Sequence, residues 1–319
     1  MAPQASLDEM RALLGTLPGP DLDSATAVLE RMRHLPVPPG ALGRLTDLVQ
    51  WLAAWQGRAK PRLDHPRIAL FAGNHGIAAR TLEPTEAVAG AVEAVLGGTA
   101  VLNRLCEAAD ADLRLYEMAL DRPTADFTQG PAMAEDDCAR AMAYGMMAAE
   151  PGLDLLILGS IGAGGETAAL ALGYALLGGA TSDWVAPGPL GERRRAVIEQ
   201  VAALHRAAMT DPFEALRRLG GVEIAATAGA ILAARRGRIP VLLDGLPATA
   251  AALVLHQADR RAIDHCRFAQ LGPEPGQQRM VAALDQAALL DLGLTLSDGS
   301  GGALALGVLR GAITGLTAG

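Results

Sequence analysis

A single carboxylate, Asp298, lies in a stretch of small residues, Leu-Ser-Asp-Gly-Ser-Gly-Gly-Ala-Leu-Ala (296–305), just before an apolar run. Two roles suit an acid at such a place. Ser297, Asp298 or Ser300 can cap a helix that we expect to begin near Gly302, because short oxygen-bearing side chains accept backbone N–H groups at helix starts. Asp298 can instead point into a cleft and act as a general base. The stretch taken alone favours the cap.

A second glycine-rich loop, Gly-Ser-Ile-Gly-Ala-Gly-Gly-Glu-Thr (159–167), has four glycines among nine residues and leads into an expected helix. Free backbone N–H groups and the positive end of a helix dipole favour an anion there. The loop lacks the Gly-Lys-Ser/Thr ending of a P-loop and fits the Gly-x-Gly-x-x-Gly pattern only in part. We expect it to bind phosphate; a close strand-to-helix turn is the alternative.

Two further stretches place polar groups after apolar runs. Gly-Asn-His-Gly (73–76) offers an amide and an imidazole, for a ligand or for the scaffold. Asp244-Gly245 follows the run 240–243, and Asp244 can orient a ligand or cap the next helix, with capping or loop bracing favoured. Arg193, Arg194 and Arg195 begin a predicted helix, so only one or two of them can face a site, and a solvated face is the alternative.

Composition narrows the class of protein. The chain has 319 residues, a net charge of −8 and 3% aromatic residues, and an acidic chain is poorly suited to nucleic acid. Three widely spaced cysteines without Cys-x-x-Cys, and six histidines without His-Glu-x-x-His, exclude a disulfide framework and a common zinc site. We see no signal-peptide pattern and no apolar run of about 18 residues. We therefore expect a soluble, cytoplasmic protein that binds neither membranes nor nucleic acid.

Apolar runs alternate with helical patterns along the chain. Helices are expected at 7–33, 41–56, 86–108, 134–149 and 190–208, and at the start of the stretch 222–257. Strands are expected in Arg-Ile-Ala-Leu-Phe-Ala (67–72), in Asp-Leu-Arg-Leu-Tyr-Glu-Met-Ala-Leu (112–120), near 154–158 and at 240–243. This alternation predicts βαβ crossovers and a mostly parallel sheet, with ligands at the carboxyl ends of the strands. The loops 73–76, 159–167, 244–249 and 297–302 are the ones to examine.

Several of these stretches occur together in the order of one known family. They are Pro-Pro-Gly-Ala-Leu-Gly-Arg-Leu (38–45), Asn-His-Gly (74–76), the loop 159–169, the block 217–245, Gly-Pro-Glu-Pro-Gly (272–276) and Ser-Asp-Gly-Ser-Gly-Gly (297–302). Nearly the whole chain resembles the nicotinate-nucleotide:dimethylbenzimidazole phosphoribosyltransferase family, which makes the lower-ligand nucleotide of cobalamin.

The resemblance implies a fold and an activity. The fold is a doubly wound, mostly parallel, Rossmann-like α/β sheet in a large domain (61–279), with a small helical domain from 1–60 completed by about 280–319. The activity moves phosphoribose from nicotinate mononucleotide to dimethylbenzimidazole, with inversion, giving α-ribazole 5'-phosphate and nicotinate. A homodimer whose partner contributes to the active site is implied, and neither a cofactor nor a metal.

The resemblance also implies roles for particular residues. Asp298 is the expected base, and Asn74, His75 and Glu274 are expected to bind the benzimidazole. The residues expected to bind the phosphate or nucleotide are Gly159, Ser160, Gly162, Gly164, Gly165, Glu166, Thr167, Arg194, Asp244 and Gly245.

The chain departs from the family's pattern where the chemistry is expected. Asp298 stands where the family has a glutamate, Ser160 replaces another acid, and Asn74 replaces an aspartate. Glu166 adds a carboxylate that would repel phosphate unless a cation pairs with it, and Arg194 aligns with the family's lysine. Two alternatives therefore stay open: a transferase that uses another base, and a non-catalytic relative that binds a nucleotide.

Overall fold

The computed structural model describes residues 6–38 and 40–317, and its centre is one sheet of parallel strands in the order β2-β1-β3-β4-β5. The predicted α/β class with a parallel sheet is confirmed. The strands are β1 (Pro66–Ala72), β2 (Asp112–Glu117), β3 (Leu155–Ile161), β4 (Val241–Leu243) and β5 (Cys266–Phe268).

Both faces of the sheet are buried at the inner strands β1, β3 and β4, because successive side chains of a strand point to opposite faces and helices cover both. The edge strand β2 is half-buried or exposed. In β1, Ala69 and Phe71 join one hydrophobic core, while Ile68 and Leu70 join another on the opposite face. Strands of this kind are continuous apolar runs in the sequence, and this is why they could be recognised.

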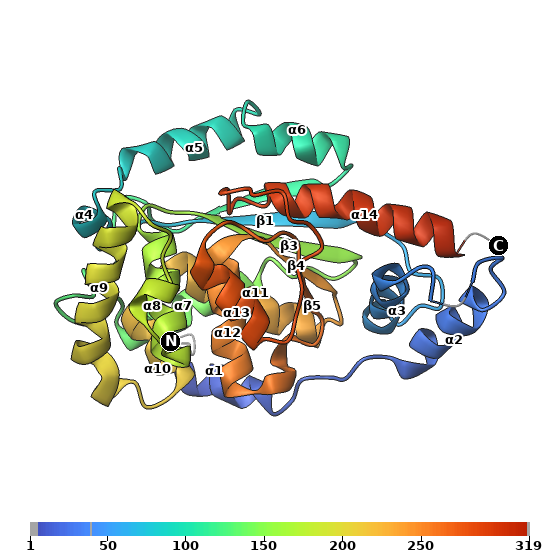
Figure 1. Cartoon of the computed structure of the whole chain (residues 1–319), viewed down its shortest axis with the longest axis horizontal. Helices are drawn as coiled ribbons and strands as arrows, with labels where there is room; N and C mark the ends of the chain where they lie inside the picture. Colours follow the sequence, from blue (N-terminus) through green and yellow to red (C-terminus); the bar gives the residue numbers. More distant parts are fainter. Residues whose placement is uncertain (1–5, 39, 318–319) are drawn as a thin grey trace, which may run out of the picture.

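Helices cover both faces (Figure 1). One layer contains α1 (Leu7–Leu14), α7 (Glu135–Met146), α8 (Gly165–Leu177), α9 (Pro189–His205), α10 (Pro212–Leu219), α11 (Val222–Arg236), α12 (Gly245–Ala258) and α13 (Pro275–Ala283). The opposite face is covered by α5 (Glu86–Leu96), α6 (Val101–Ala108), α14 (Ser300–Thr317) and part of α3 (Arg44–Gln56). A single turn, α4 (Ala78–Thr81), follows β1.

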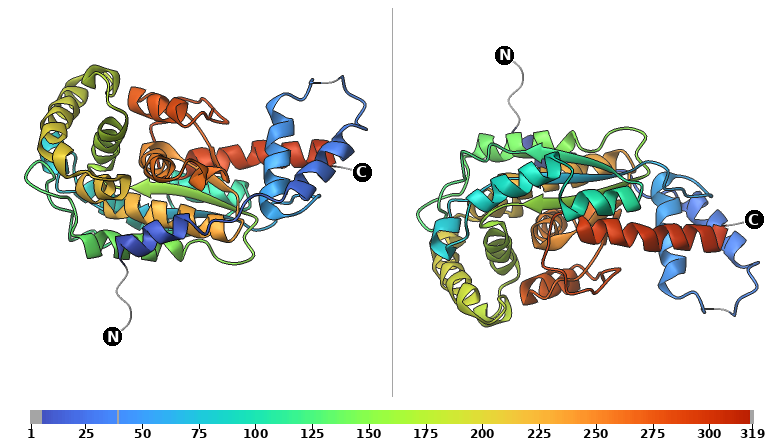
Figure 2. Two further views of the ribbon diagram at one scale, coloured as in Figure 1. Left: turned by 90° about the horizontal axis from the view of Figure 1, so that it is seen from below. Right: turned by 90° about the horizontal axis from the view of Figure 1, so that it is seen from above.

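A small separate core forms at one end of the molecule (Figure 2). There α2 (Leu22–Met32) packs on α3 and on the end of α14 through Val28, Val49, Ala53, Ala312 and Leu316. Helix α1 belongs elsewhere, since it packs on α7 in the large core. The division of the chain at residue 60 stays a prediction.

Two expected helices are broken. The region 7–33 forms α1 and α2 because Gly15, Pro18, Gly19 and Pro20 interrupt it, and 86–108 forms α5 and α6 because Gly97 and Gly98 separate them. Strand β5 and helices α10 and α13 were not predicted. The last helix begins at Ser300, close to the expected Gly302.

The stretch Glu86–Ala108 is long and apolar enough to cross a membrane, with a mean hydropathy of 1.2 over 18 residues and 22% of that window buried. We had expected no apolar run of this length from the sequence. Length and composition alone are weak evidence for a span, and the break between α5 and α6 leaves no continuous helix. A lipid-exposed break of this kind would leave backbone groups without partners.

The strand order creates one place where crossovers run in opposite directions. The chain leaves β1 for β2 on one side and reaches β3 on the other, so the switch point lies between β1 and β3. In doubly wound sheets, ligands bind beyond the carboxyl ends of the strands at this point. The loops 73–76 and 162–165 are therefore the ones that border it.

Helices α7 and α11 cross so closely that glycine is required at the contact. A Cβ on Gly229 would lie 1.9 Å from the carbonyl oxygen of Met142, and one on Gly145 would lie 1.9 Å from that of Ala226.

We predict that Gly229→Ala lowers the free energy of unfolding by about 3 kcal/mol, measured by urea denaturation. The control Gly90→Ala, in α5 with nothing within 4 Å of its Cβ, should raise it by about 0.5–1 kcal/mol. Equal effects of the two substitutions would contradict this packing.

Candidate active site

A cavity of about 320 Å³ lies at the switch point, at the carboxyl ends of the strands. Seven of the predicted site residues line this cavity, a neighbouring one of about 50 Å³, or both. Ser160, Gly162, Gly165, Glu166 and Asp298 line the larger cavity, and Glu166 also lines the smaller one. Gly245 and Glu274 line the smaller cavity. The other predicted residues lie behind these walls.

The turn 297–299 forms one wall because it packs on the end of β3. The Ser160 N–H donates to the carbonyl oxygen of Ser297 at 2.6 Å. A Cβ on Gly159 would lie 2.4 Å from the Gly299 nitrogen, so only glycine allows this approach. Gly159 therefore acts through packing, by bringing the turn of Asp298 to the cavity.

Asp298 contacts the start of the last helix and also lines the cavity, so its position is compatible with both roles that the sequence left open. Its Oδ1 accepts the Ser300 N–H at 3.0 Å, at the start of α14, and the half-buried side chain also lines the larger cavity. Among the described residues, its Oδ2 has no hydrogen-bond partner. A carboxylate held at one oxygen and open at the other can accept a proton from a ligand.

Asp244 is fully buried and braces the same turn from behind. Its Oδ2 accepts the Gly301 N–H at 2.9 Å, and no side-chain bond caps its own helix α12. The predicted capping is correct in kind, but the helix concerned is α14, 57 residues further on. Burial, and then repulsion from Asp298, raises the pKa of Asp244 to about 7.

The start of α8 holds an anion, as predicted, but the anion is a side chain. Glu83 accepts the Gly164 N–H at 3.2 Å through Oε2 and the Thr167 hydroxyl at 3.1 Å through Oε1. The Ala163 N–H donates to Asn74 and the Gly165 N–H to Gly162. The amides of residues 163–165 are thus bonded within the chain, and the binding of phosphate by the loop's N–H groups stays a prediction.

Arg194 lies behind the cavity, 5% exposed, among three acids. Its Nη2 donates to Glu166 at 2.7 Å, and ion pairs at 3.8 Å and 3.6 Å join it to Glu83 and Glu274. Glu274 also accepts the Ala186 N–H at 2.6 Å, and burial raises its pKa. Arg194 is thus the cation that pairs with Glu166.

Asn74 and His75, predicted to bind the base, line neither cavity. Asn74 joins two loops, donating to the Leu120 carbonyl at 3.1 Å and accepting from Ala163 at 3.3 Å. His75 is buried with its Nε2 2.6 Å from Glu223 Oε1. The Asn74 amide is hydrogen-bonded to the protein through both its nitrogen and its oxygen, whereas His75 Nδ1 is buried without a hydrogen-bond partner among the described residues. Both side chains support the wall from behind, and their binding of the base stays a prediction.

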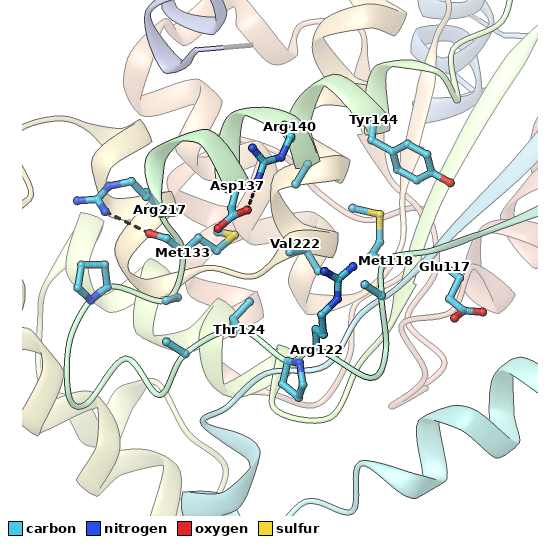
Figure 3. A pocket seen from close by; sticks show the side chains of 17 residues that line it. Glu117, Met118, Arg122, Thr124, Met133, Asp137, Arg140, Tyr144, Arg217 and Val222 are labelled. Atoms are coloured by element: carbon cyan, nitrogen blue, oxygen red, sulfur yellow. Dashed lines mark hydrogen bonds and ion pairs between the residues drawn. The ribbon is translucent and has the colours of Figure 1, made fainter. Parts of the chain in front are cut away.

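A larger hollow, of about 940 Å³, lies apart from these residues (Figure 3). It is an open groove between the end of β2 and α7, lined by Met118, Met133 and Tyr144 among others. In it, Arg140 pairs with Asp137, and Arg217 donates to the Met133 carbonyl (Figure 3). It contains none of the predicted site residues, so the cavity of about 320 Å³ at the switch point is the candidate active site.

Comparisons with known proteins identify the family of the chain. The family model described as Phosphoribosyltransferase matches residues 17–318. A nicotinate-nucleotide–dimethylbenzimidazole phosphoribosyltransferase of Brucella anthropi is 46% identical over 312 residues, covering 96% of this chain and 92% of the relative. The same-named protein of Allorhizobium ampelinum is 47% identical with the same coverage.

Solved structures give the same result. A crystal structure of the nicotinate-nucleotide–dimethylbenzimidazole phosphoribosyltransferase of Thermus thermophilus has a TM-score of 0.88 at 33% identity, covering 94% of this chain and 97% of that one. The chain belongs to this phosphoribosyltransferase family. The resemblance seen in the sequence is confirmed.

Two acidic residues of the site were not predicted from the sequence. Glu83 and Glu223 both line the larger cavity. Glu223 is the one charged residue in Gly-Gly-Val-Glu-Ile-Ala-Ala (220–226), and an acid after two glycines at the start of an apolar helix was a usable signal. Glu83 follows no strand and sits in no glycine-rich loop, so no comparable signal marks it.

The raised pKa of Asp244 predicts a specific pH dependence of stability. The native state holds this proton more tightly than the unfolded chain, so the contribution is complete below the ordinary pKa of 3.8 and is lost as pH rises through about 7. We expect the free energy of unfolding to fall more steeply from about pH 5 to about pH 8 in the wild type than in Asp244→Asn, which does not titrate. Urea denaturation at several pH values measures this, and parallel curves for the two proteins would contradict it.

Proposed function

We propose that this chain transfers phosphoribose from nicotinate mononucleotide to dimethylbenzimidazole, giving α-ribazole 5'-phosphate and nicotinate. The observation that carries the proposal is the position of Asp298, a carboxylate with one open oxygen on the wall of the switch-point cavity. Family membership over residues 17–318 and the names of the relatives support the substrates. Nothing in those names supports another base or a non-catalytic role.

Asp298 acts as the general base in this proposal. As one ring nitrogen of the benzimidazole attacks the anomeric carbon, the proton on the other ring nitrogen passes to the carboxylate. Nicotinate leaves from the opposite face, so the configuration inverts. Asp298 has a shorter side chain than the family's glutamate, and the packing of Ser297 on Ser160 supports the position of its turn.

Arg194 is the cation that we propose for the phosphate. It lies next to Glu166 and Glu274, which both line the smaller cavity, where α12 and α13 begin. Helix starts favour phosphate oxygens. In this proposal the phosphate competes with Glu166 for the guanidinium, because three carboxylates already surround it.

We place the protein in the cytoplasm. All three cysteines are free and buried, which suits a compartment that keeps thiols reduced.

A homodimer is also part of the proposal. Leu96 and Val101, at the junction of α5 and α6, are 70% and 63% exposed, and apolar side chains of this size on one surface are typical of an interface. Ala91 of α5 lines the larger cavity, so a partner bound to α5 would lie near the site.

We predict that the double substitution Leu96→Asp/Val101→Asp halves the mass measured by sedimentation. An unchanged dimer would exclude this surface, and a wild-type monomer would exclude the dimer.

The activity itself is tested by incubating the pure protein with nicotinate mononucleotide and dimethylbenzimidazole and measuring α-ribazole 5'-phosphate. We expect product from the wild type, and kcat lower by about 10²–10⁴-fold in Asp298→Asn, since the amide cannot accept the proton. Asp298→Glu, which keeps the carboxylate, is the matched control and should retain more activity than the amide variant. No wild-type product above the enzyme-free rate would contradict the function, and full activity of Asp298→Asn would remove the assigned base.

A further inference from the structure

Glu223 is a buried carboxylate with one of its oxygens unpaired. The side chain is 1% exposed at the first turn of α11, and Oε1 lies 2.6 Å from His75 Nε2. Oε2 is buried and has no partner among residues 6–38 and 40–317. Leaving a buried carboxylate oxygen unsatisfied is costly, so this arrangement calls for an explanation beyond stability.

Glycines from three separate segments surround this carboxylate. A Cβ on Gly221 would lie 2.6 Å and one on Gly73 3.3 Å from Oε2, while one on Gly165 would lie 3.2 Å from Oε1. The end of β1 and the starts of α8 and α11 therefore approach Glu223 through their backbones, and His75 supplies the side chain that contacts it. The carboxylate is left at the wall of the larger cavity, next to Gly165.

The walls of that cavity carry negative charge. Four carboxylates line it, those of Glu83, Glu166, Glu223 and Asp298, and the other residues described as lining it include no lysine, arginine or histidine. Glu83, Glu166 and Asp298 are engaged with Gly164, Arg194 and Ser300, respectively. A low-dielectric space with such walls stabilises positive charge within it.

The proposed reaction develops positive charge at the ribose. The donor starts with a positively charged pyridinium ring. As the bond from its nitrogen to the anomeric carbon breaks, the electron pair goes to that nitrogen, and positive charge appears on the anomeric carbon and ring oxygen. The acceptor nitrogen then supplies the pair for the new bond, and the proton of the other ring nitrogen goes to Asp298.

We propose that Glu223 is the carboxylate that stabilises this positive charge on the ribose, and that His75 is the positioning residue that holds it. The inference rests on the proposed transfer reaction. Glu223 forms no covalent bond and takes no proton. The His75 ring fixes Oε1, so the carboxylate is oriented before the substrate arrives and needs no reorganisation during the reaction.

Steady-state kinetics of Glu223→Gln test this role, since glutamine keeps the shape and removes the charge. We expect kcat to fall by about 10²–10³-fold, with the KM for dimethylbenzimidazole changed less than about 3-fold. The matched control is Asp154→Asn, another buried acid, which binds Arg62 and the amides of Asp64 and His65 at the opposite ends of the strands. It should lower stability and leave kcat unchanged.

The outcomes separate the two proposals. Absence of wild-type turnover would overturn the proposed function and this inference with it. Wild-type turnover with an unchanged kcat in folded Glu223→Gln would overturn the role of Glu223 alone, as would an equal loss in Asp154→Asn. Should Glu223→Gln not fold, the same comparison is made with His75→Gln, where we expect a kcat loss of at least about 10-fold and where an unchanged kcat would overturn the inference.

Discussion

The hydrogen bond from the Gly301 N–H to the buried carboxylate of Asp244 fixes the geometry of the site. It joins the end of β4 to the start of α14, two points 57 residues apart. Because α14 starts there, the turn before it reaches β3, where Ser297 accepts from Ser160. Asp298 in that turn then has to lie between the strand ends and the cavity. A carboxylate buried in the interior thus determines where a second, more exposed carboxylate can act.

Acids fill the same structural role at several other places. Glu83 binds the amide at the start of α8, Asp298 the amide at the start of α14, and Glu274 the Ala186 amide. Glycine-rich turns leave their N–H groups free, and here carboxylates of the chain supply the anions that such groups favour. One consequence is a cavity with negative walls. That suits the proposed reaction, in which positive charge develops on a sugar, and in the same proposal the guanidinium of Arg194, behind the cavity, binds the phosphate.

Much of the fold could be predicted from the sequence because its signals are local. Strands buried on both faces are continuous apolar runs, and each ends in a glycine-rich loop, so the parallel sheet and the loops at its carboxyl edge could be anticipated. The break between α5 and α6 was not predicted, because the apolar pattern continues across Gly97 and Gly98. Strand β5 has three residues, which is too short for a periodic pattern.

The site was harder to predict because its contacts are distant in the sequence. Asp244 looked like a cap for the helix that follows it, yet its partner lies in α14. Nothing near Glu83 shows that its carboxylate would occupy the anion position of the 159–167 loop. Helix capping and base catalysis were treated as alternatives for Asp298, although one carboxylate oxygen can accept the helix N–H while the other stays open to a ligand.

The most direct measurement is a crystal structure with nicotinate and α-ribazole 5'-phosphate bound. Our account predicts the Asp298 carboxylate about 3 Å from the benzimidazole nitrogen that is not bonded to ribose, the one that carries the proton in the free base. A carboxylate turned away from the product and bound only to Ser300 would contradict it.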